Sequence, residues 1–268
     1  MSGLALKSIR PTQTTGRTLE IAPGIHTIPS RMSRMYLVED ESLTLIDAGL
    51  PWDVRTVFRY VESIGRRPED IDAILLTHNH PDHTSGARSI SKRANADVIA
   101  HEDDTRLHHT KGRYLGYMGM FNATDLPLPF LRRTTVSQVA SDGDVLPIAG
   151  GIQVIHTPGH TPGSACYLLK ERGVIFTGDT AFSNGKSVSR SIPFPGYDHE
   201  AYCRSLEKLA EMDFDVMCGG HGRPLLGNAS EKLRQLLSAR PEPPTWADLL
   251  LRRLPGRISR GQSLSEED

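Results

Sequence analysis

Cysteine is scarce in this sequence. The three cysteines, Cys166, Cys203 and Cys218, are odd in number and far apart, which argues against a disulfide framework and against a zinc site built from thiolates. Their simplest role is that of small buried hydrophobic side chains. We therefore expect them to contribute to packing.

Long apolar runs are also missing. The longest, such as residues 247–251, are far too short to cross a bilayer. The N-terminus shows neither the apolar stretch nor the cleavage site of a signal peptide. These absences predict a soluble, cytoplasmic protein.

The chain has no strong charge of either sign. Its 268 residues include 31 basic and 32 acidic ones, for a net charge of −1, so no global field would attract nucleic acid or an anionic membrane. With 38% hydrophobic and 24% charged residues, the composition is that of a globular protein that can bury a sizeable core. We expect a small-molecule substrate, with neither nucleic acid nor a membrane as partner.

Three segments are expected along the chain. Residues 1–17 lack periodicity and predict an N-terminal arm, residues 18–240 carry the periodic elements of one domain, and residues 241–268 predict a proline-rich linker, a helix and a tail. Within the domain, residues 102–134 mix aromatic and Met side chains with Gly and Pro without a clean period. This insertion is expected to be a lid over the site or, equally, a hydrophobic cluster or homodimer contact.

The periodic segments alternate between strands and helices, which is typical of an α/β protein. Short β-forming runs at the start of the domain predict an antiparallel meander, and later helices are expected to cover the sheet. The expected strands are residues 25–28, 35–38, 43–46, 73–76, 97–100, 152–156, 174–179 and 216–221, and the expected helices are residues 53–64, 199–212 and 229–239, with a short one after Gly86. His101, which follows one of these strands, is expected to be structural.

The densest group of potential metal ligands follows the apolar run at residues 73–76. His78, His80, Asp82 and His83 fall within six positions there. His78 and His80 can face the same way on an extended segment, whereas Asp82 and His83 come after a proline has turned the chain. The two pairs can therefore serve two metal ions.

Other strand ends carry a carboxylate or an imidazole. Asp47 precedes a glycine turn and is expected to support a ligand rather than bind metal itself. His160 lies in a loop fixed by two prolines and two glycines, which favours a ligand role. Asp179 and His221 end two further strands beside glycines. Five strand ends thus present Asp or His.

In this order, the residues resemble the five motifs of the metallo-β-lactamase superfamily. The resemblance covers roughly residues 20–235, and the joint pattern is far more specific than any one motif. It implies a four-layer αββα sandwich, in which two mixed sheets face each other, helices cover the outside and the metals lie along one edge. The motif residues are Asp47, His78, His80, Asp82, His83, His160, Asp179 and His221.

The resemblance also implies how a dinuclear centre would be divided. His78, His80 and His160 would hold one ion; Asp82, His83 and His221 would hold the other; and Asp179 would bridge them. Zinc is the default, although iron or manganese would also suit nitrogen and carboxylate ligands. A water between two such ions, about 3.5–4 Å apart, becomes hydroxide near neutral pH, and Asp82 is the best placed proton shuttle.

Two relatives narrow the expected substrate to an ester, lactone or thioester of a small molecule. Residues 192–198 resemble the corresponding part of acyl-homoserine lactonases, but Phe182 stands where those enzymes carry a tyrosine, for which Tyr197 or Tyr114 could substitute. The stretch at residues 178–180 is similar to glyoxalase II. The carboxylate at Asp179 departs from the cysteine-containing true β-lactamases, which argues against antibiotic hydrolysis.

Two alternatives of the same fold remain open. One is an oxidoreductase resembling the mononuclear iron persulfide dioxygenases, and the other is a phosphodiesterase or nuclease. One iron per chain with oxygen uptake would favour the first. The near-neutral charge disfavours the second.

Overall fold

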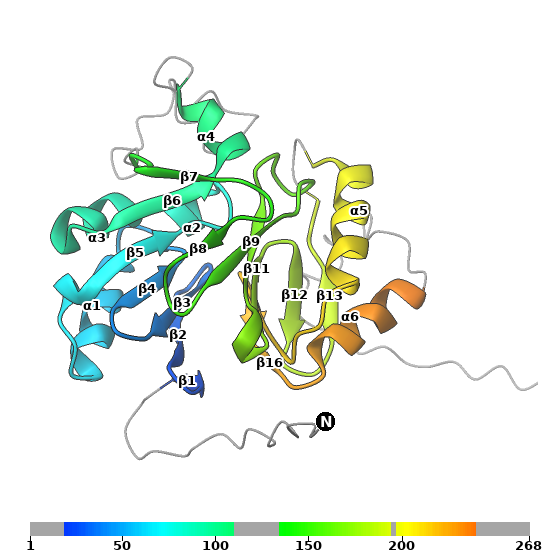
Figure 1. Ribbon diagram of the computed structural model, residues 1–268, viewed down its shortest axis with the longest axis horizontal. Coiled ribbons are helices and arrows are strands. Elements are labelled where there is room, and N and C mark those ends of the chain that lie inside the picture. The colour runs from blue at the N-terminus through cyan, green and yellow to red at the C-terminus, as the bar shows by residue number, and fades with distance from the viewer. Residues whose placement is uncertain (1–18, 110–133, 194–196, 240–268) are drawn as a thin grey trace, which may run out of the picture.

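The computed structural model describes residues 19–109, 134–193 and 197–239. Two large sheets face each other, with helices on the outer side of each, so the described chain forms four layers (Figure 1). This confirms the predicted αββα sandwich. The expected arm at residues 1–17, the segment at 241–268 and most of the expected insertion lie outside the described residues.

The first sheet has seven strands in the order β1-β2-β3-β4-β5-β6-β7. Its first four strands form the predicted antiparallel meander, and β4 to β7 run parallel to one another. The strands are β1 Glu20–Ala22, β2 Ile25–Pro29, β3 Arg34–Glu39, β4 Leu43–Ile46, β5 Ile71–Leu75, β6 Asp97–His101 and β7 Gln138–Ala140.

The second sheet has six strands in the order β16-β14-β11-β10-β9-β8, and a third sheet of three strands has the order β13-β12-β15. The third sheet was not expected from the sequence. The strands are β8 Val145–Leu146, β9 Ile152–His156, β10 Ala165–Leu169, β11 Val174–Gly178, β12 Ala181–Asn184, β13 Val188–Arg190, β14 Val216–Gly219, β15 Gly222–Arg223 and β16 Leu225–Leu226.

The helices lie mainly on the outer faces. In Figure 1, α1 and α3 lie beside the first sheet, and α5 and α6 beside the second. The α-helices are α1 Val54–Ser63, α2 Pro81–Thr84, α3 Ala87–Ala94, α4 Glu102–His109, α5 His199–Ala210 and α6 Ala229–Ser238, and short 3-10 turns span Pro68–Asp70 and Lys170–Arg172. The expectation of irregular chain from residue 102 is wrong for its first eight residues, because they form α4.

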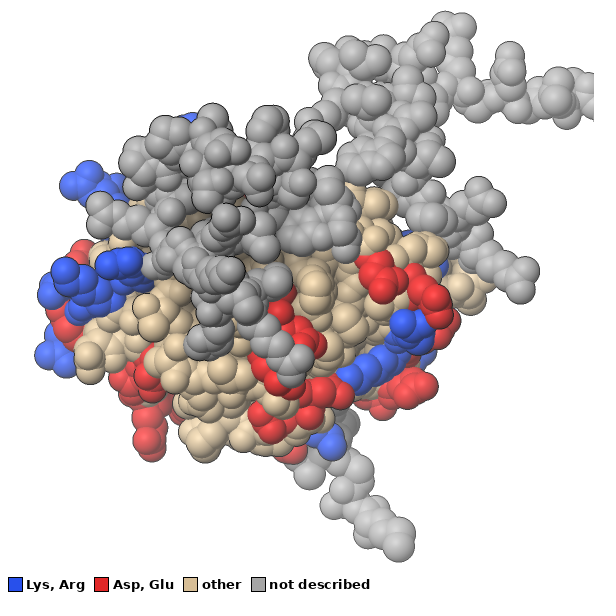
Figure 2. Space-filling view, turned by 90° about the horizontal axis from the view of Figure 1, so that it is seen from above, with Lys and Arg blue, Asp and Glu red and all other residues tan. Residues whose placement is uncertain are grey.

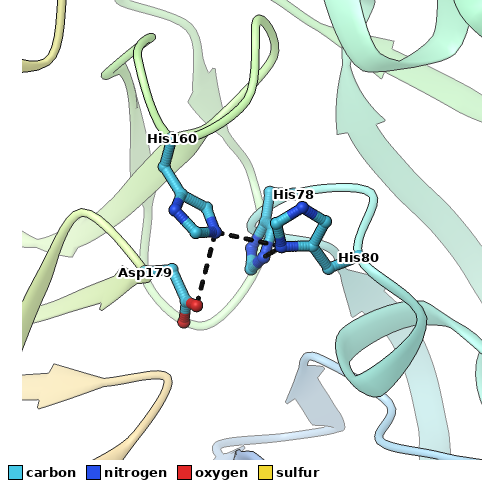
Figure 3. A group of neighbouring side chains, drawn as sticks. All are labelled: His78, His80, His160 and Asp179. Atoms are coloured by element: carbon cyan, nitrogen blue, oxygen red, sulfur yellow. Dashed lines mark hydrogen bonds and ion pairs between the residues drawn. The ribbon is translucent and has the colours of Figure 1, made fainter. Parts of the chain in front are cut away.

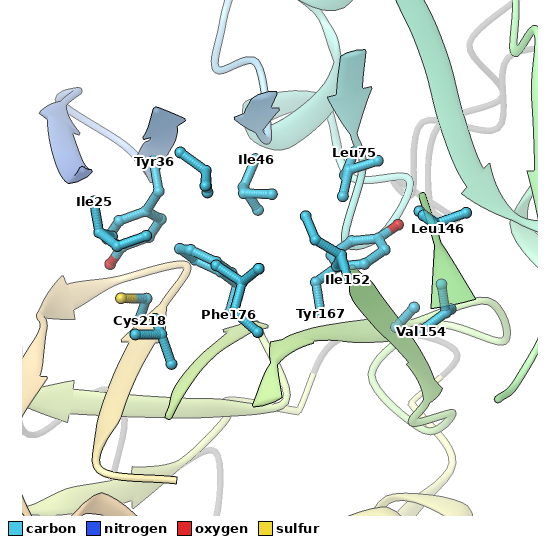
Figure 4. Close-up of a cluster of buried hydrophobic side chains, with 14 of the residues drawn as sticks. Ile25, Tyr36, Ile46, Leu75, Leu146, Ile152, Val154, Tyr167, Phe176 and Cys218 are labelled. Carbon is cyan, nitrogen blue, oxygen red and sulfur yellow. The ribbon is translucent and has the colours of Figure 1, made fainter. Parts of the chain in front are cut away.

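Strands of the first sheet are continuous apolar runs in the sequence, because side chains on both faces of the sheet are buried. Along β3, Met35 and Leu37 face the layer of α1 and α3, whereas Tyr36 and Val38 face the second sheet. Both faces of the sheet are covered, so both sets are buried. The layer between the sheets includes Phe176 from β11, whose ring lies 5.5 Å from that of Tyr36 (Figure 4).

The surface agrees with the balanced composition. In Figure 2, acidic and basic side chains occur on the same face of the described chain, and neither sign covers it. Within the described residues, no helix combines the length and apolar character needed to span a bilayer.

Replacing Phe176 with alanine should lower the free energy of unfolding by about 3–5 kcal/mol, because a fully buried aromatic ring leaves a cavity between two sheets. Urea denaturation of the purified variant measures this. The matched control is Val145→Ala, at a side chain that is 65% exposed, and it should change stability by less than about 0.5 kcal/mol. Equal effects at both positions would contradict the packing of Phe176 between the two sheets.

Candidate metal centre

The loops at one end of the two sheets bring the predicted ligands together. His78 and His80 follow β5, Asp82 and His83 lie in α2, His160 follows β9, Asp179 follows β11, and His221 follows β14. These side chains form two groups whose potential ligand atoms lie within 4.8 Å of one another. The first group is His78, His80, His160 and Asp179, and the second is Asp82, His83 and His221.

Three ring nitrogens converge in the first group (Figure 3). His80 Nδ1 lies 2.9 Å from His78 Nε2 and 3.0 Å from His160 Nε2. A single proton on His80 Nδ1 can lie in only one of these two contacts. A metal ion, in contrast, accepts a lone pair from each of the three nitrogens at once.

Hydrogen bonds to the outer ring nitrogens of His78 and His160 determine which of their nitrogens point toward the centre. Thr77 Oγ1 donates its proton to Asp47 Oδ2 at 2.8 Å. In its 3.0 Å contact with His78 Nδ1, the same oxygen therefore accepts a hydrogen bond from the imidazole N–H. His160 Nδ1 lies 3.1 Å from Ser191 Oγ. Both residues therefore present Nε2 to the centre.

The second group is oriented in the same way. Asp47 Oδ2 accepts a hydrogen bond from His83 Nδ1 at 2.7 Å, and the backbone carbonyl of Met32 accepts one from His221 Nδ1 at 2.7 Å. Nε2 of each histidine then faces Asp82 Oδ2, at 3.5 Å from His83 and 3.6 Å from His221. Asp47 thus orients His83, which is a predicted ligand, and also accepts the backbone N–H of Thr77.

Asp179, a member of the first group, also reaches the second group. Its Oδ2 is 3.4 Å from His160 Nε2 and 3.2 Å from His221 Nε2, and its Oδ1 is 3.4 Å from His83 Nε2. A carboxylate in this place can offer one oxygen to each side. Gly220 makes room for it, because a Cβ at that position would lie 2.3 Å from Asp179 Oδ1.

The electrostatics differ between the groups. Burial, reinforced by the neighbouring imidazoles, lowers the pKa of His78 and lowers that of His80 to about 3. Burial alone would also lower the pKa of His83, but the carboxylates of Asp82, Asp47 and Asp179 outweigh it and raise that pKa to about 10. Neutral imidazoles in the first group are ready to act as ligands at neutral pH.

Two buried polar atoms support a cation at this place. His83 Nε2 and Asp179 Oδ1 make no hydrogen bond among the described residues and face each other as an ion pair at 3.4 Å, although such buried atoms are almost always hydrogen-bonded in proteins. Imidazole and carboxylate ligands suit zinc and also iron or manganese. The donor set therefore fits divalent metal ions.

A family model described as the metallo-beta-lactamase superfamily matches residues 29–221. The chain belongs to that superfamily. Hydroxyacylglutathione hydrolase GloC of Haemophilus influenzae is 29% identical over 61% of this chain and 74% of its own length, and YobT of Bacillus subtilis is 29% identical over 75% and 88%.

Solved structures agree on the fold of this superfamily member. A metallo-beta-lactamase family protein from Thermus thermophilus matches with a TM-score of 0.66, at 21% sequence identity, over 82% of this chain and 80% of its own. At this identity the likeness concerns the fold alone. The roles of the individual residues in this metallo-beta-lactamase superfamily protein stay predictions.

The residues expected to contact substrate lie in different places. Phe182 packs edge-on against His221, with ring centroids 5.2 Å apart. Tyr197 packs against Tyr202, with ring centroids 5.1 Å apart, and its hydroxyl lies 3.4 Å from His199 Nδ1. Tyr114 lies outside the described residues. Only Phe182 of these residues is thus seen in contact with a predicted ligand.

A third group of potential ligands, His101, Asp103 and His156, lies at the ends of β6 and β9 and the start of α4. The rings of His101 and His156 stack at 3.8 Å and 10°. His101 Nδ1 accepts the N–H of Asp103, and His156 Nε2 lies 2.8 Å from the carbonyl of Pro162. Parallel rings keep their in-plane lone pairs from converging, so we assign no metal to this group.

The sequence did not indicate three of the orienting partners. Ser191 comes from the chain after β13, the Met32 carbonyl from the turn before β3, and Thr77 from the residue before His78. The hydroxyl of Thr77 stood within the motif and could have been found there. A backbone carbonyl such as that of Met32 leaves no signal in residue types.

Asp179→Ala should reduce the bound metal from about two ions per chain to one or none, because a carboxylate shared by two sites serves both. Elemental analysis of protein purified without chelator gives the ratio. The control is Asp213→Ala, at a side chain that is 91% exposed, and it should keep the metal content of the natural protein. Equal metal content in both variants would remove Asp179 from the ligand set.

Asp47→Asn should weaken metal binding by about 10–100-fold, because an amide has one acceptor oxygen and cannot replace both Oδ2, which accepts from His83 and the Thr77 hydroxyl, and Oδ1, which accepts the Thr77 N–H. Asparagine tolerates the backbone at this position, where φ is 57°, so the change tests the hydrogen bonds rather than the turn. Competition with a chromophoric chelator measures the affinity. Unchanged affinity would show that His83 is oriented by packing alone.

Proposed function

We propose that this protein is a dinuclear metal-dependent hydrolase that cleaves an ester, lactone or thioester bond in a small molecule. The observation that carries the proposal is the place of Asp179, within 3.4 Å of His83, His160 and His221. A carboxylate shared by two ligand groups suits two ions close together. A single-ion oxidoreductase would need only one of these groups.

When bound, two such ions would supply Lewis acidity toward the substrate carbonyl and a water that is acidic near neutral pH. The chain supplies the remaining functions. His83 and His160 are fully buried, and Asp179 is 5% exposed, so the inner side of the centre excludes bulk water. Hydrogen bonds from the outer nitrogens hold the rings and leave little reorganisation for the reaction.

Asp82 is the group best suited to hold and move a proton. Its side chain is 21% exposed, against 5% for Asp179, so it borders both the centre and the solvent. A carboxylate in this position can accept a proton from the attacking water and pass it to the leaving group. This role supports leaving groups such as alkoxide or thiolate.

The substrate would extend from the centre past His221. This imidazole is 32% exposed and borders an open groove of about 470 Å³ that Phe182, Ser189 and Arg223 also line. Phe182 supplies an apolar wall and no hydroxyl to polarise a carbonyl. Because a relative is named as a hydroxyacylglutathione hydrolase, thioesters are the first substrate class to test.

The test is a screen of the metal-loaded protein against acyl thioesters, aryl esters, lactones and phosphodiesters, with Asp179→Ala as the inactive reference. Turnover of one carboxylic class that is lost in the reference supports the proposal. Turnover of phosphodiesters alone would overturn it. One bound iron per chain with oxygen uptake on a persulfide would also overturn it.

Asp82→Asn should lower kcat on the best substrate by about 10²-fold or more, because an amide cannot take up the proton. Its carbonyl oxygen can still face His83 and His221, so metal content, measured in parallel, should fall much less than in Asp179→Ala. A variant that keeps its metal and its kcat would show that Asp82 is a ligand without a proton-transfer role.

A further inference from the structure

One buried carboxylate outside the ligand set joins two of the ligand loops. Asp104 lies in the first half of α4 and is 2% exposed. Its Oδ1 accepts the backbone N–H of Gly163 at 2.8 Å, and its Oδ2 accepts the hydroxyl of Thr161 at 3.1 Å. The backbone N–H of Asn79 also faces this carboxylate closely enough to lower its pKa, and Asn79 and Asp104 line one small cavity together with His78.

These three donors flank the nitrogen ligands of the first group. Asn79 lies between His78 and His80 in the chain, and Thr161 and Gly163 directly follow His160. The two loops are about 80 residues apart in sequence and meet at His80 Nδ1 and His160 Nε2, which lie 3.0 Å apart. A carboxylate that contacts both loops can therefore help to set the distance between His80 and His160. No local turn can set this distance, because the two residues are far apart in sequence.

The contact is close on the side of the His160 loop. A Cβ at position 163 would lie 2.3 Å from the backbone nitrogen of Asp104 and 2.5 Å from its carboxyl carbon. Thr161 is held further by Ser164, whose Oγ lies 2.8 Å from Thr161 Oγ1. The loop thus rests directly on α4, with Asp104 at the point of contact.

Asp104 is poorly suited to stabilise the fold for its own sake. Burial raises the pKa of this carboxyl to about 6, although the N–H groups of Gly163 and Asn79 and the hydroxyl of Thr161 oppose that shift. Its protonated form is favoured more in the folded than in the unfolded chain, so its contribution to stability declines as the pH rises through about 4 to 6. A carboxylate that is ionised at neutral pH in this buried position is better explained by a role in the metal centre.

We propose that Asp104 is a positioning residue that ties the loop of His78 and His80 to the loop of His160 and so sets the geometry of the three-histidine site. The inference rests on the proposed metal centre. It does not assign Asp104 any contact with metal or substrate. It predicts that loss of the carboxylate loosens the two loops and weakens the first site while the fold persists.

The test compares Asp104→Asn with Glu102→Gln, which removes the same charge from the same turn of α4. In metal-free protein, Asp104→Asn should speed amide hydrogen exchange in peptides that contain Asn79 and Gly163. In metal-binding assays, Asp104→Asn should lower the affinity for one of the two ions by about 10–100-fold. It should also shift the visible absorption of the cobalt-substituted protein. Glu102→Gln should change neither property.

Urea denaturation of the metal-free proteins separates positioning from general stability. The midpoint of Asp104→Asn should fall no further than that of Glu102→Gln. Thr161→Val, which removes one donor and leaves the carboxylate, should show the same changes to a smaller degree, and it serves as the second variant if Asp104→Asn does not fold.

The outcomes distinguish the two ideas. Faster amide exchange, lower affinity for one metal ion and an altered cobalt spectrum together support the inference. Unchanged metal affinity and cobalt spectrum in Asp104→Asn overturn the positioning role and leave the proposed hydrolase intact. Failure of the natural protein to bind metal overturns the proposed function, and unchanged exchange near Asn79 and Gly163 overturns the loop connection separately.

Discussion

The fold holds ring nitrogens at a separation that hydrogen bonding alone cannot satisfy. His80 Nδ1 is 3.0 Å or less from two other imidazole nitrogens, and a proton can serve only one of these contacts. Burial keeps these rings neutral, so the remaining lone-pair repulsion is not relieved by charge. A bound cation relieves this repulsion. The loops at this end of both sheets therefore pack in a way that holds the predicted ligands in position for a cation.

The connection between the layers and the centre runs through a few polar contacts. Tyr167 of β10 donates to the carbonyl of Leu76 at 2.7 Å, directly before the His78 loop. Tyr36 of β3 donates to the carbonyl of Gly219 at 2.8 Å, just before His221. Each tyrosine has its ring in the apolar layer between the sheets and donates its hydroxyl to a carbonyl at the end of a strand or just after it. Core packing thereby fixes the place of ligands from both sheets.

Much of this arrangement follows from the sequence because the ligands lie within a few residues of strand ends, where local pattern is informative. The loops that carry His78 and His160 could be predicted in that way, and the αββα layers could be predicted from the family resemblance that these motifs carry. The third sheet could not, because its short strands β12 and β13 carry no long apolar run. Ser191 and Asp104 act on segments distant in sequence, and only the folded chain brings them together.

Exposure differs between two sides of the centre. His83 and His160 are fully buried, whereas His221 is 32% exposed and borders the groove. The ring of Phe182 packs edge-on against His221 beside this groove, which is why the proposed substrate path runs past His221. Groove residues such as Arg223 lie outside the two groups of potential ligands. Members of one superfamily can thus keep a ligand set and differ in substrate, because specificity depends on contacts outside that set.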